Sequence, residues 1–333
     1  MIPTAAAPTT AVPTVLVLRA LGLGDLLTAV PALRALHAHH PGHRMVLAAP
    51  VGLRPIVELT GAVDEVLPTA ELGPLGWMGP SPRVAVNLHG RGPRSTHALL
   101  ALAPGTLLTH AHPEHPGLPG ARWEPAVHEV HRWCRLLSSA GIPADPGDLA
   151  LARPEVPSPA PGAVVVHPTA ALPARRWPAD RFAEVARGLA GRGLRVVVTG
   201  SAAERDVAAQ VAITAGLPPE SVLAGRTDLP TLAALVAEAS LVVCADTGVG
   251  HLATAYGTPS VVLFGPVAPT RWGPPPQRPQ HVALWSGITS DPFAATPDPG
   301  LVRITAAAVR TAAEGLLGPA PGRLPCTPAA RAG

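Results

Sequence analysis

The chain has 333 residues, enough for one large domain or for two ordinary ones that each bury a core. Its apolar fraction of 47% excludes a disordered chain, and a formal net charge of +3 without a run of basic residues argues against nucleic acid as a partner. The three cysteines are scattered, which argues against structural disulfides and zinc. No apolar run approaches the ~18 residues of a membrane helix, and the N-terminus lacks the basic region of a signal peptide. The sequence therefore predicts a cytoplasmic protein.

The first expected strand is followed by a glycine-bearing turn and a helix. Residues 15–19 form an apolar run typical of a buried parallel strand, and apolar residues recur at helical spacing over residues 26–38. The turn between them ends at Asp25, at the carboxyl end of the strand, where open α/β sheets bind ligands. Asp25 is therefore a candidate functional residue, with the N-cap of the helix as its alternative role. Residues 1–14 are expected to be a flexible tail.

Two more strands are expected in this half of the chain, at residues 44–48 and 84–88. The second ends in a loop that carries His89 and Arg91, again at the edge of a sheet where ligands bind, although surface arginines are usually only solvated. Residues 102–125 are rich in proline, glycine and histidine, which predicts a long loop. A helix is expected over residues 126–140.

A proline-rich segment at residues 153–162, RPEVPSPAPG, has the composition of a linker. Strands and helices alternate on both sides of it. We therefore expect an α/β fold of two Rossmann-like parallel-sheet domains facing a cleft, residues 15–152 and 163–317, with the last helix crossing back to the first domain. The second domain is expected to contain strands at 163–167, 194–199, 221–223, 241–244 and 260–264 and helices at 179–190, 202–215, 231–239 and 309–317. Residues 318–333 are expected to be a second flexible tail.

The segment at residues 241–266 reads as strand, loop, helix and strand, and its loop is informative. Asp246, Thr247 and Gly248 end a strand and open a helix, where backbone N–H groups and the helix dipole attract an anion. A diphosphate fits that description. The alternative, which the sequence leaves open, is that Asp246 and Thr247 only cap the helix that carries His251.

Other loops of this half are expected to reach the same edge of the sheet. Thr169 follows the strand at residues 163–167, and Arg175 and Arg176 precede the next helix. A guanidinium group there would neutralise a leaving diphosphate, although the two arginines could also be an ordinary solvated pair. Glu204 follows the strand at residues 194–199, where a carboxylate can accept hydrogen bonds from ribose hydroxyls.

Three motifs stand out: GDLLTAVPAL at residues 24–33, ARRWPADRF at 174–182 and DTGVGHLATAYGTPSVVLFGP at 246–266. Together they resemble glycosyltransferase family 9, the ADP-heptose heptosyltransferases, and the resemblance runs through both halves over residues 15–317. It implies a GT-B architecture and an inverting, metal-independent transfer of a sugar, with an ADP-sugar donor bound by the C-terminal domain. The ADP-sugar is a substrate in this chemistry, and no metal or other cofactor is expected.

The resemblance also implies roles for single residues. Asp25 matches the family's proposed general base, and Arg175 matches a lysine that binds the donor phosphate. The matching donor-binding positions are Thr169 in the phosphate loop, Glu204 at the ribose, and Asp246, Thr247, Gly248 and His251 in the last motif. Arg176 is added as a donor-binding candidate from its place beside Arg175. On the acceptor side lie Asn87, His89 and Arg91, with Asn87 where relatives often have an acidic residue. Arginine at position 175 keeps the charge of lysine but not its geometry.

The leading functional hypothesis is transfer of a heptose-like sugar from a nucleotide diphosphate donor to an acceptor hydroxyl, as in lipopolysaccharide core biosynthesis. The acceptor is left open among a glycolipid, a glycan and a small molecule, so transient contact with a membrane surface is compatible with the sequence, and no obligate protein partner is implied. Two alternatives remain, a nucleotide-sugar epimerase of the same architecture and a nucleotide-sugar-binding protein that has lost catalysis. Analysis of the products distinguishes the three.

Overall fold

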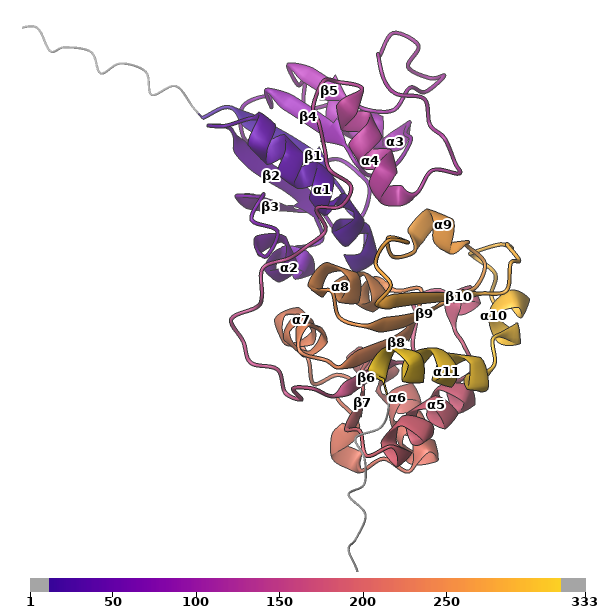
Figure 1. Cartoon of the computed structure of the whole chain (residues 1–333). Coiled ribbons are helices and arrows are strands. Elements are labelled where there is room, and N and C mark those ends of the chain that lie inside the picture. Colours follow the sequence, from indigo (N-terminus) through magenta and orange to yellow (C-terminus); the bar gives the residue numbers. More distant parts are fainter. Residues whose placement is uncertain (1–11, 319–333) are drawn as a thin grey trace, which may run out of the picture.

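A computed structural model describes residues 12–318 of the chain. The tails expected at residues 1–14 and 318–333 lie almost wholly outside the described residues, and Thr14 already belongs to the first strand. The described residues form two parallel sheets, one in each half of the chain (Figure 1). None of their helices is both long and apolar enough to cross a membrane.

The N-terminal half forms a five-stranded parallel sheet with the strand order β3-β2-β1-β4-β5. Its elements are β1 (Thr14–Leu18), α1 (Leu23–His39), β2 (Arg44–Ala49), α2 (Arg54–Glu58), β3 (Glu65–Pro68), β4 (Val84–Asn87), α3 (Arg94–Leu100), β5 (Thr106–Leu108) and α4 (Glu129–Ser138). Strand β1 is fully buried, and its alternate side chains pack into two apolar clusters, one on each face of the sheet. Val15 and Val17 pack on the side of α1 and α4, and Leu16 and Leu18 on the side of α3.

The C-terminal half forms a second five-stranded parallel sheet with the order β10-β9-β8-β6-β7. Its elements are β6 (Val164–His167), α5 (Ala179–Gly191), β7 (Val196–Val198), α6 (Arg205–Ala215), α7 (Leu229–Ala237), β8 (Leu241–Ala245), α8 (Gly248–Tyr256), β9 (Ser260–Phe264), α9 (Pro269–Trp272), β10 (His281–Trp285), α10 (Pro299–Arg303) and α11 (Ala306–Leu317). Helices α7 and α8 share one apolar cluster with the sheet, and α5, α6 and α11 share another on its opposite face.

The strand expected at residues 221–223 is wrong. Residues Pro219–Ser221 form a 3-10 turn, and only a single β-bridge joins Val222 to Val198 of β7. Proline at positions 218 and 219 removes two backbone N–H groups just where a strand ladder would begin. If this bridge is counted as a very short sixth strand beside β7, the sheet has the strand order of a Rossmann fold. The order of the strands then reverses between β6 and β8, which is the switch point.

Several short elements were not expected from the sequence. They are the four short helices α2, α3, α9 and α10 and three strands of three to five residues, β3, β5 and β10. Strand β5 lies inside the segment expected to be a long loop. All three strands lie at the edges of their sheets. An edge strand has a neighbour on one side only and is often short, so it carries a weak apolar pattern.

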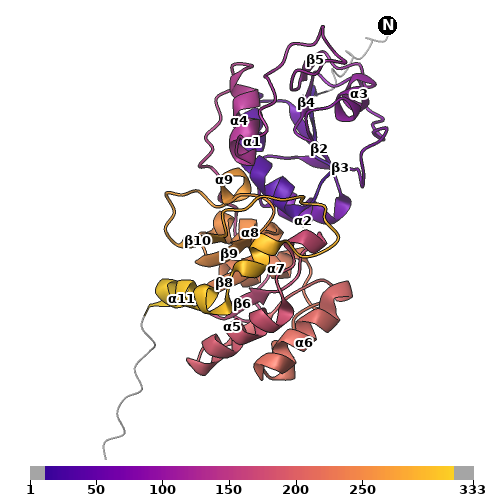
Figure 2. The same ribbon diagram turned by 90° about the vertical axis from the view of Figure 1, so that its right-hand side faces the viewer.

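The two halves meet where α1 packs on α8 (Figures 1 and 2). Glycine makes this approach possible: a Cβ atom at Gly248 would lie 2.9 Å from the side chain of Leu23, and one at Gly24 would lie 3.0 Å from the ring of His251. The apolar cluster under α1 and α4 therefore continues into the cluster under α7 and α8. Residues 139–163, which include the proline-rich segment, connect the halves without a helix or strand.

The expected return of the last helix to the N-terminal half is wrong. Helix α11 packs mainly on α5, β8 and β9 of its own half. Its buried residues Ala306, Val309 and Ala313 belong to the cluster that also contains the buried face of α5. Burial of this small apolar face stabilises the position of α11 beside α5 instead of across the other half.

Candidate active site between the two halves

Asp25 lies in the first turn of α1, next to the switch point of the N-terminal sheet between β1 and β4. The N-cap of α1 is Gly22, so the alternative role of Asp25 as N-cap is wrong. Its carboxylate instead accepts a hydrogen bond from the backbone of Gly22 and lies 3.3 Å from Nη2 of Arg19. The side chain is 29% exposed, so the carboxylate remains accessible to a substrate.

Arg19 holds the surroundings of Asp25 together. Its side chain is 1% exposed and donates hydrogen bonds to the carbonyl of Leu88, to Oγ1 of Thr28 at 3.1 Å and to Oε1 of Glu129 at 3.1 Å, in addition to Asp25. A buried cation is stable only with such partners, so Arg19 ties the first turn of α1 to β4 and α4. Sequence reasoning missed this residue, although an arginine directly after an apolar strand was the available signal.

The environment of Asp25 raises its pKa above the ordinary value. Burial is the main cause, the charges of Arg19 and Arg175 oppose it, and the charge of Glu129 adds to it. A carboxylate with a raised pKa accepts a proton more readily than an aspartate in water. Asp25 therefore suits the role of a base at this position.

Arg175 and Asp246 form an ion pair at the edge of the C-terminal sheet. Nη1 of Arg175 lies 3.2 Å from Oδ2 of Asp246, whose side chain is only 5% exposed. The side chain of Thr247, the N-cap of α8, makes no capping hydrogen bond, and Asp246 is engaged with Arg175, so the capping alternative is wrong. The first turn of α8 thus keeps backbone N–H groups without a side-chain cap, and Nε of Arg175 is buried without a partner.

Charges from the two halves lie close enough to influence each other. The charge of Arg175, in the C-terminal half, acts to lower the pKa of Asp25, against the larger raising effect of burial. Burial raises the pKa of Asp246, Arg175 opposes this effect, and the charge of Asp25 raises the pKa further. The packing of α1 on α8 therefore brings Asp25 near the Arg175–Asp246 pair and places His251 against Gly24.

Thr169 and Glu204 belong to a polar chain at the end of β6. His167 bonds to Oγ1 of Thr199 at 3.0 Å and to Oγ1 of Thr169 at 3.3 Å, and burial lowers its pKa to about 4. Burial raises the pKa of Glu204, but hydrogen bonds from Ser201 and Thr169 outweigh it, and the net pKa is below the ordinary value. Glu204 is therefore ionised, and it forms a capping box with Ser201.

Arg176 is not brought to the Arg175–Asp246 pair. Its Nε donates to the carbonyl of Ala170 at 2.9 Å and its Nη2 to that of Ala171 at 3.3 Å. The exposed side chain thereby tethers the loop that follows β6.

The acceptor-side candidates differ in their surroundings. Asn87 is fully buried, and its Nδ2 donates to the hydroxyls of Ser95, Thr96 and Thr109 at 3.0, 3.3 and 3.1 Å. Its Oδ1 accepts from the backbone N–H of His89 at 3.1 Å, so Asn87 positions the loop after β4 instead of meeting solvent. Burial lowers the pKa of His89, and Arg91 is exposed.

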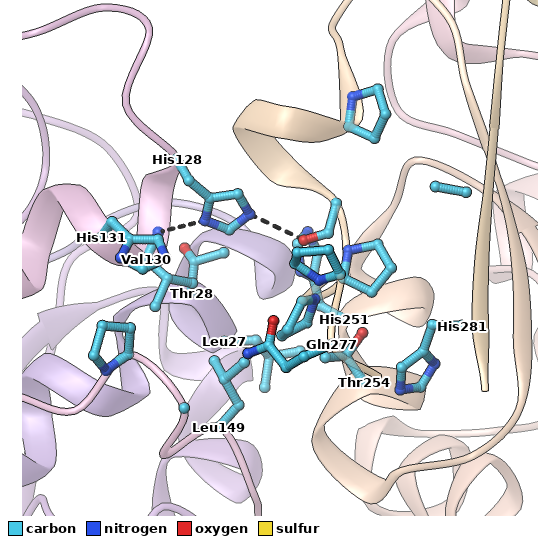
Figure 3. A pocket seen from close by; sticks show the side chains of 18 of the residues that line it. Leu27, Thr28, His128, Val130, His131, Leu149, His251, Thr254, Gln277 and His281 are labelled. Carbon is cyan, nitrogen blue, oxygen red and sulfur yellow. Dashed lines mark hydrogen bonds between the residues drawn. The ribbon is translucent and has the colours of Figure 1, made fainter. Parts of the chain in front are cut away.

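Two hollows adjoin these residues. One, of about 10 Å³, is lined by Asp246, Thr247 and His251 among others and has room for about one water molecule. The other, of about 570 Å³, lies between the two halves and has the size of a small-molecule site (Figure 3). Of the site residues expected from the sequence, His251 alone lines this second hollow. Within residues 12–318, no group of three His, Cys, Asp or Glu side chains is placed to hold a metal ion.

The model of glycosyltransferase family 9 (heptosyltransferase) matches residues 122–296, more than half of the chain. The chain belongs to glycosyltransferase family 9. This family 9 member is 38% identical over 149 residues to lipopolysaccharide heptosyltransferase 1 of Pseudomonas aeruginosa, a match that covers 43% of the chain and 41% of that relative. The chain thus matches about two-fifths of the length of this curated relative.

Solved structures of similar proteins show the same fold over nearly the whole chain. E. coli ADP-heptose lipopolysaccharide heptosyltransferase II has a TM-score of 0.71 at 23% identity, with 91% of this chain and 98% of that one covered. An E. coli heptosyltransferase solved with ADP has a TM-score of 0.68 at 20% identity, with 91% and 99% covered. The GT-B architecture expected for this family 9 member is confirmed.

Proposed function

We propose that the chain is a glycosyltransferase that moves a heptose-like sugar from an ADP-linked donor to an acceptor hydroxyl, with inversion and without a metal ion. Membership of family 9 and the similarity to lipopolysaccharide heptosyltransferases support the class of reaction. The observation that carries the mechanism is the meeting of Asp25 from one half with the Arg175–Asp246 pair from the other.

In the proposed reaction, the acceptor oxygen forms a bond to the anomeric carbon while the bond from that carbon to the diphosphate oxygen breaks. Asp25 takes the proton of the acceptor hydroxyl, and its raised pKa favours that step. The departing diphosphate gains negative charge. The unpartnered Nε of Arg175 and the uncapped first turn of α8 after Thr247 would stabilise this charge, as a metal ion does in other transferases.

The remaining donor contacts follow from the positions of the polar chain. Glu204, ionised and half-buried, would accept hydrogen bonds from the ribose hydroxyls, and Thr169 would lie at the phosphates. Gly248 and His251 would lie beside the sugar, where α8 meets α1. The hollow at Asp246 holds about one water, so the bulk of a bound donor would lie outside it.

The cellular setting is part of the proposal. A cytoplasmic enzyme would use ADP-heptose where nucleotide sugars are made, and a glycolipid acceptor would add transient contact with a membrane surface. His89 and Arg91, on the loop that Asn87 positions, would face a bound acceptor. No obligate protein partner and no cofactor are proposed.

The test is product analysis with ADP-heptose, with and without EDTA. The expected result is release of ADP, unchanged by EDTA, together with a glycosylated alcohol whose anomeric configuration by NMR is opposite to that of the donor. Loss of ADP release on chelation would refute metal independence. Appearance of an epimerised nucleotide sugar, or binding of ADP-heptose without ADP release, would refute the transferase itself.

A further inference from the structure

The hollow between the two halves has walls from both of them. Figure 3 shows side chains of α1 and α4 on one side and of α8 and the region before β10 on the other. Nε2 of His128, the N-cap residue of α4, donates a hydrogen bond to the carbonyl of Gly273 at 2.9 Å and so links the two walls. The volume of about 570 Å³ can hold a molecule with one or two rings.

The wall of this cavity is mainly apolar. None of its lining residues is Asp, Glu, Lys or Arg, and most are proline, leucine, valine, alanine or glycine. Burial lowers the pKa of His251 and of His281 to about 4, so both rings are neutral. Arg278 lies against the wall without being part of the lining, and its guanidinium already donates to the carbonyls of Thr254 at 2.9 Å and Gly147 at 3.1 Å. A carboxylate or phosphate group in the cavity would therefore lose its hydration without meeting a cation of the lining.

One polar atom in the wall lacks a partner. His281 is 8% exposed, and its Nδ1 pairs with Oγ of Ser260 at 2.9 Å. Its Nε2 is buried and has no hydrogen-bond partner among the described residues. Buried polar atoms are normally paired, so this nitrogen calls for a hydrogen-bonding group on whatever fills the cavity.

One residue of the cavity wall, Thr28, lies close to Asp25. Oγ1 of Thr28, in its wall, and Oδ1 of Asp25 lie 3.1 and 3.3 Å from the same Nη2 of Arg19. The two oxygens are therefore separated by no more than two hydrogen-bond lengths. On the opposite wall, the pKa of His251 is lowered mainly by burial, next by His128 and then by Arg175. His251 therefore lies close enough to Arg175 to respond to its charge.

We propose that this cavity binds the acceptor and that the acceptor is an uncharged, mainly apolar alcohol with a second hydrogen-bonding group. The inference rests on the proposed function, because it uses Asp25 as the base. The apolar body fills the space between α1, α4 and β10, the second polar group meets Nε2 of His281, and the hydroxyl reaches past Thr28 to Asp25. The observations thus favour a small apolar alcohol over a phosphorylated or carboxylated glycan.

The test uses two matched probes, 2,6-bis(hydroxymethyl)naphthalene and 6-(hydroxymethyl)-2-naphthoic acid, which differ in one charged group. Calorimetry on the full chain should show one site for the neutral diol, with a dissociation constant of about 1 mM or lower, as expected for a ligand of this size. The carboxylate should bind at least tenfold more weakly. With ADP-heptose present, the diol should be glycosylated and identified by mass spectrometry.

Two cavity variants and one control locate the site. Ala283→Phe fills the cavity from the edge strand β10 and should weaken diol binding at least tenfold. Leu284→Phe changes the next residue of β10, which packs in the cluster on the opposite face, and should leave diol binding within threefold. Gln277→Arg places a cation on an exposed part of the wall and should reverse the preference towards the carboxylate. Thermal unfolding checks that each variant is folded.

The outcomes separate the two proposals. Equal affinity for diol and carboxylate, no binding of the diol, or binding that neither Ala283→Phe nor Gln277→Arg alters would overturn the cavity as the acceptor site. Diol binding without glycosylation, while ADP-heptose is turned over on another alcohol, would overturn its role as acceptor and leave the proposed function intact. Failure of ADP-heptose to bind or turn over at all would overturn the proposed function and, with it, the acceptor role.

Discussion

Replacing Asp25 with asparagine removes the proposed base while keeping the shape of the side chain. Proton removal by a positioned base typically contributes about 10²–10⁴-fold in rate. We therefore expect Asp25→Asn to lower turnover of ADP-heptose by about that factor, with the affinity for ADP nearly unchanged. Turnover is measured as ADP release at saturating donor, and affinity by calorimetry.

The same substitution has a predictable effect on stability. The pKa of Asp25 is raised in the folded protein, so at neutral pH the ionised carboxylate is disfavoured relative to the unfolded chain. Asparagine removes that penalty and keeps an oxygen that can accept from Arg19 and from the backbone of Gly22. The free energy of unfolding should stay within about 1 kcal/mol of the parent, because the lost ion pair and the relieved penalty offset each other.

Glu129→Gln is the matched control. It removes a carboxylate from the same guanidinium of Arg19, at 3.1 Å, without touching the proposed base. Because Glu129 raises the pKa of Asp25, the acid limb of the pH–rate profile should move to lower pH while turnover at neutral pH changes less than tenfold. Turnover within tenfold of the parent in Asp25→Asn, or an equal loss in Glu129→Gln, would refute the assignment of Asp25 as base.

Three further predictions test other parts of the structure. Arg175→Gln should weaken ADP binding by about 10–100-fold because it removes a charge-assisted contact, whereas Arg175→Lys should retain binding within about tenfold. Calorimetry that finds equal ADP affinity in Arg175→Gln and the parent would contradict the diphosphate role. His167 has a pKa of about 4 in the folded protein, so below pH 6.5 it takes up a proton when the chain unfolds. Between pH 7 and 5 the free energy of unfolding, measured with urea, should therefore fall by about 2 kcal/mol more in the parent than in His167→Gln. Equal falls in the two proteins would contradict the neutral buried ring. Gly248→Ala places a Cβ 2.9 Å from Leu23 and should cost about 1–3 kcal/mol in urea unfolding, unless α1 and α8 separate freely.

Much of the fold was determined by local features of the sequence. Runs of valine, leucine and alanine such as those of β1 and β8 are buried on both faces, and they show as apolar runs because both faces of a parallel sheet are covered. The motif after β8 placed Asp246, Thr247 and Gly248 correctly at a strand-to-helix junction. The edge strands β3, β5 and β10 could not be predicted in this way, because a strand with one neighbour is less buried and has a weaker apolar pattern.

Tertiary structure alone decided how the candidate site is built. Asp246 pairs with Arg175, 71 residues away, and Arg19 pairs with Glu129, 110 residues away, so no local pattern could reveal either contact. Asn87 is a fully buried anchor because three hydroxyls from later elements surround it. The cavity between the halves exists only once α1 packs on α8, because its walls come from elements far apart in the chain. Local sequence determines strands and turns through backbone preference and apolar pattern, whereas charges, cavities and unpaired polar atoms depend on which distant segments are buried together.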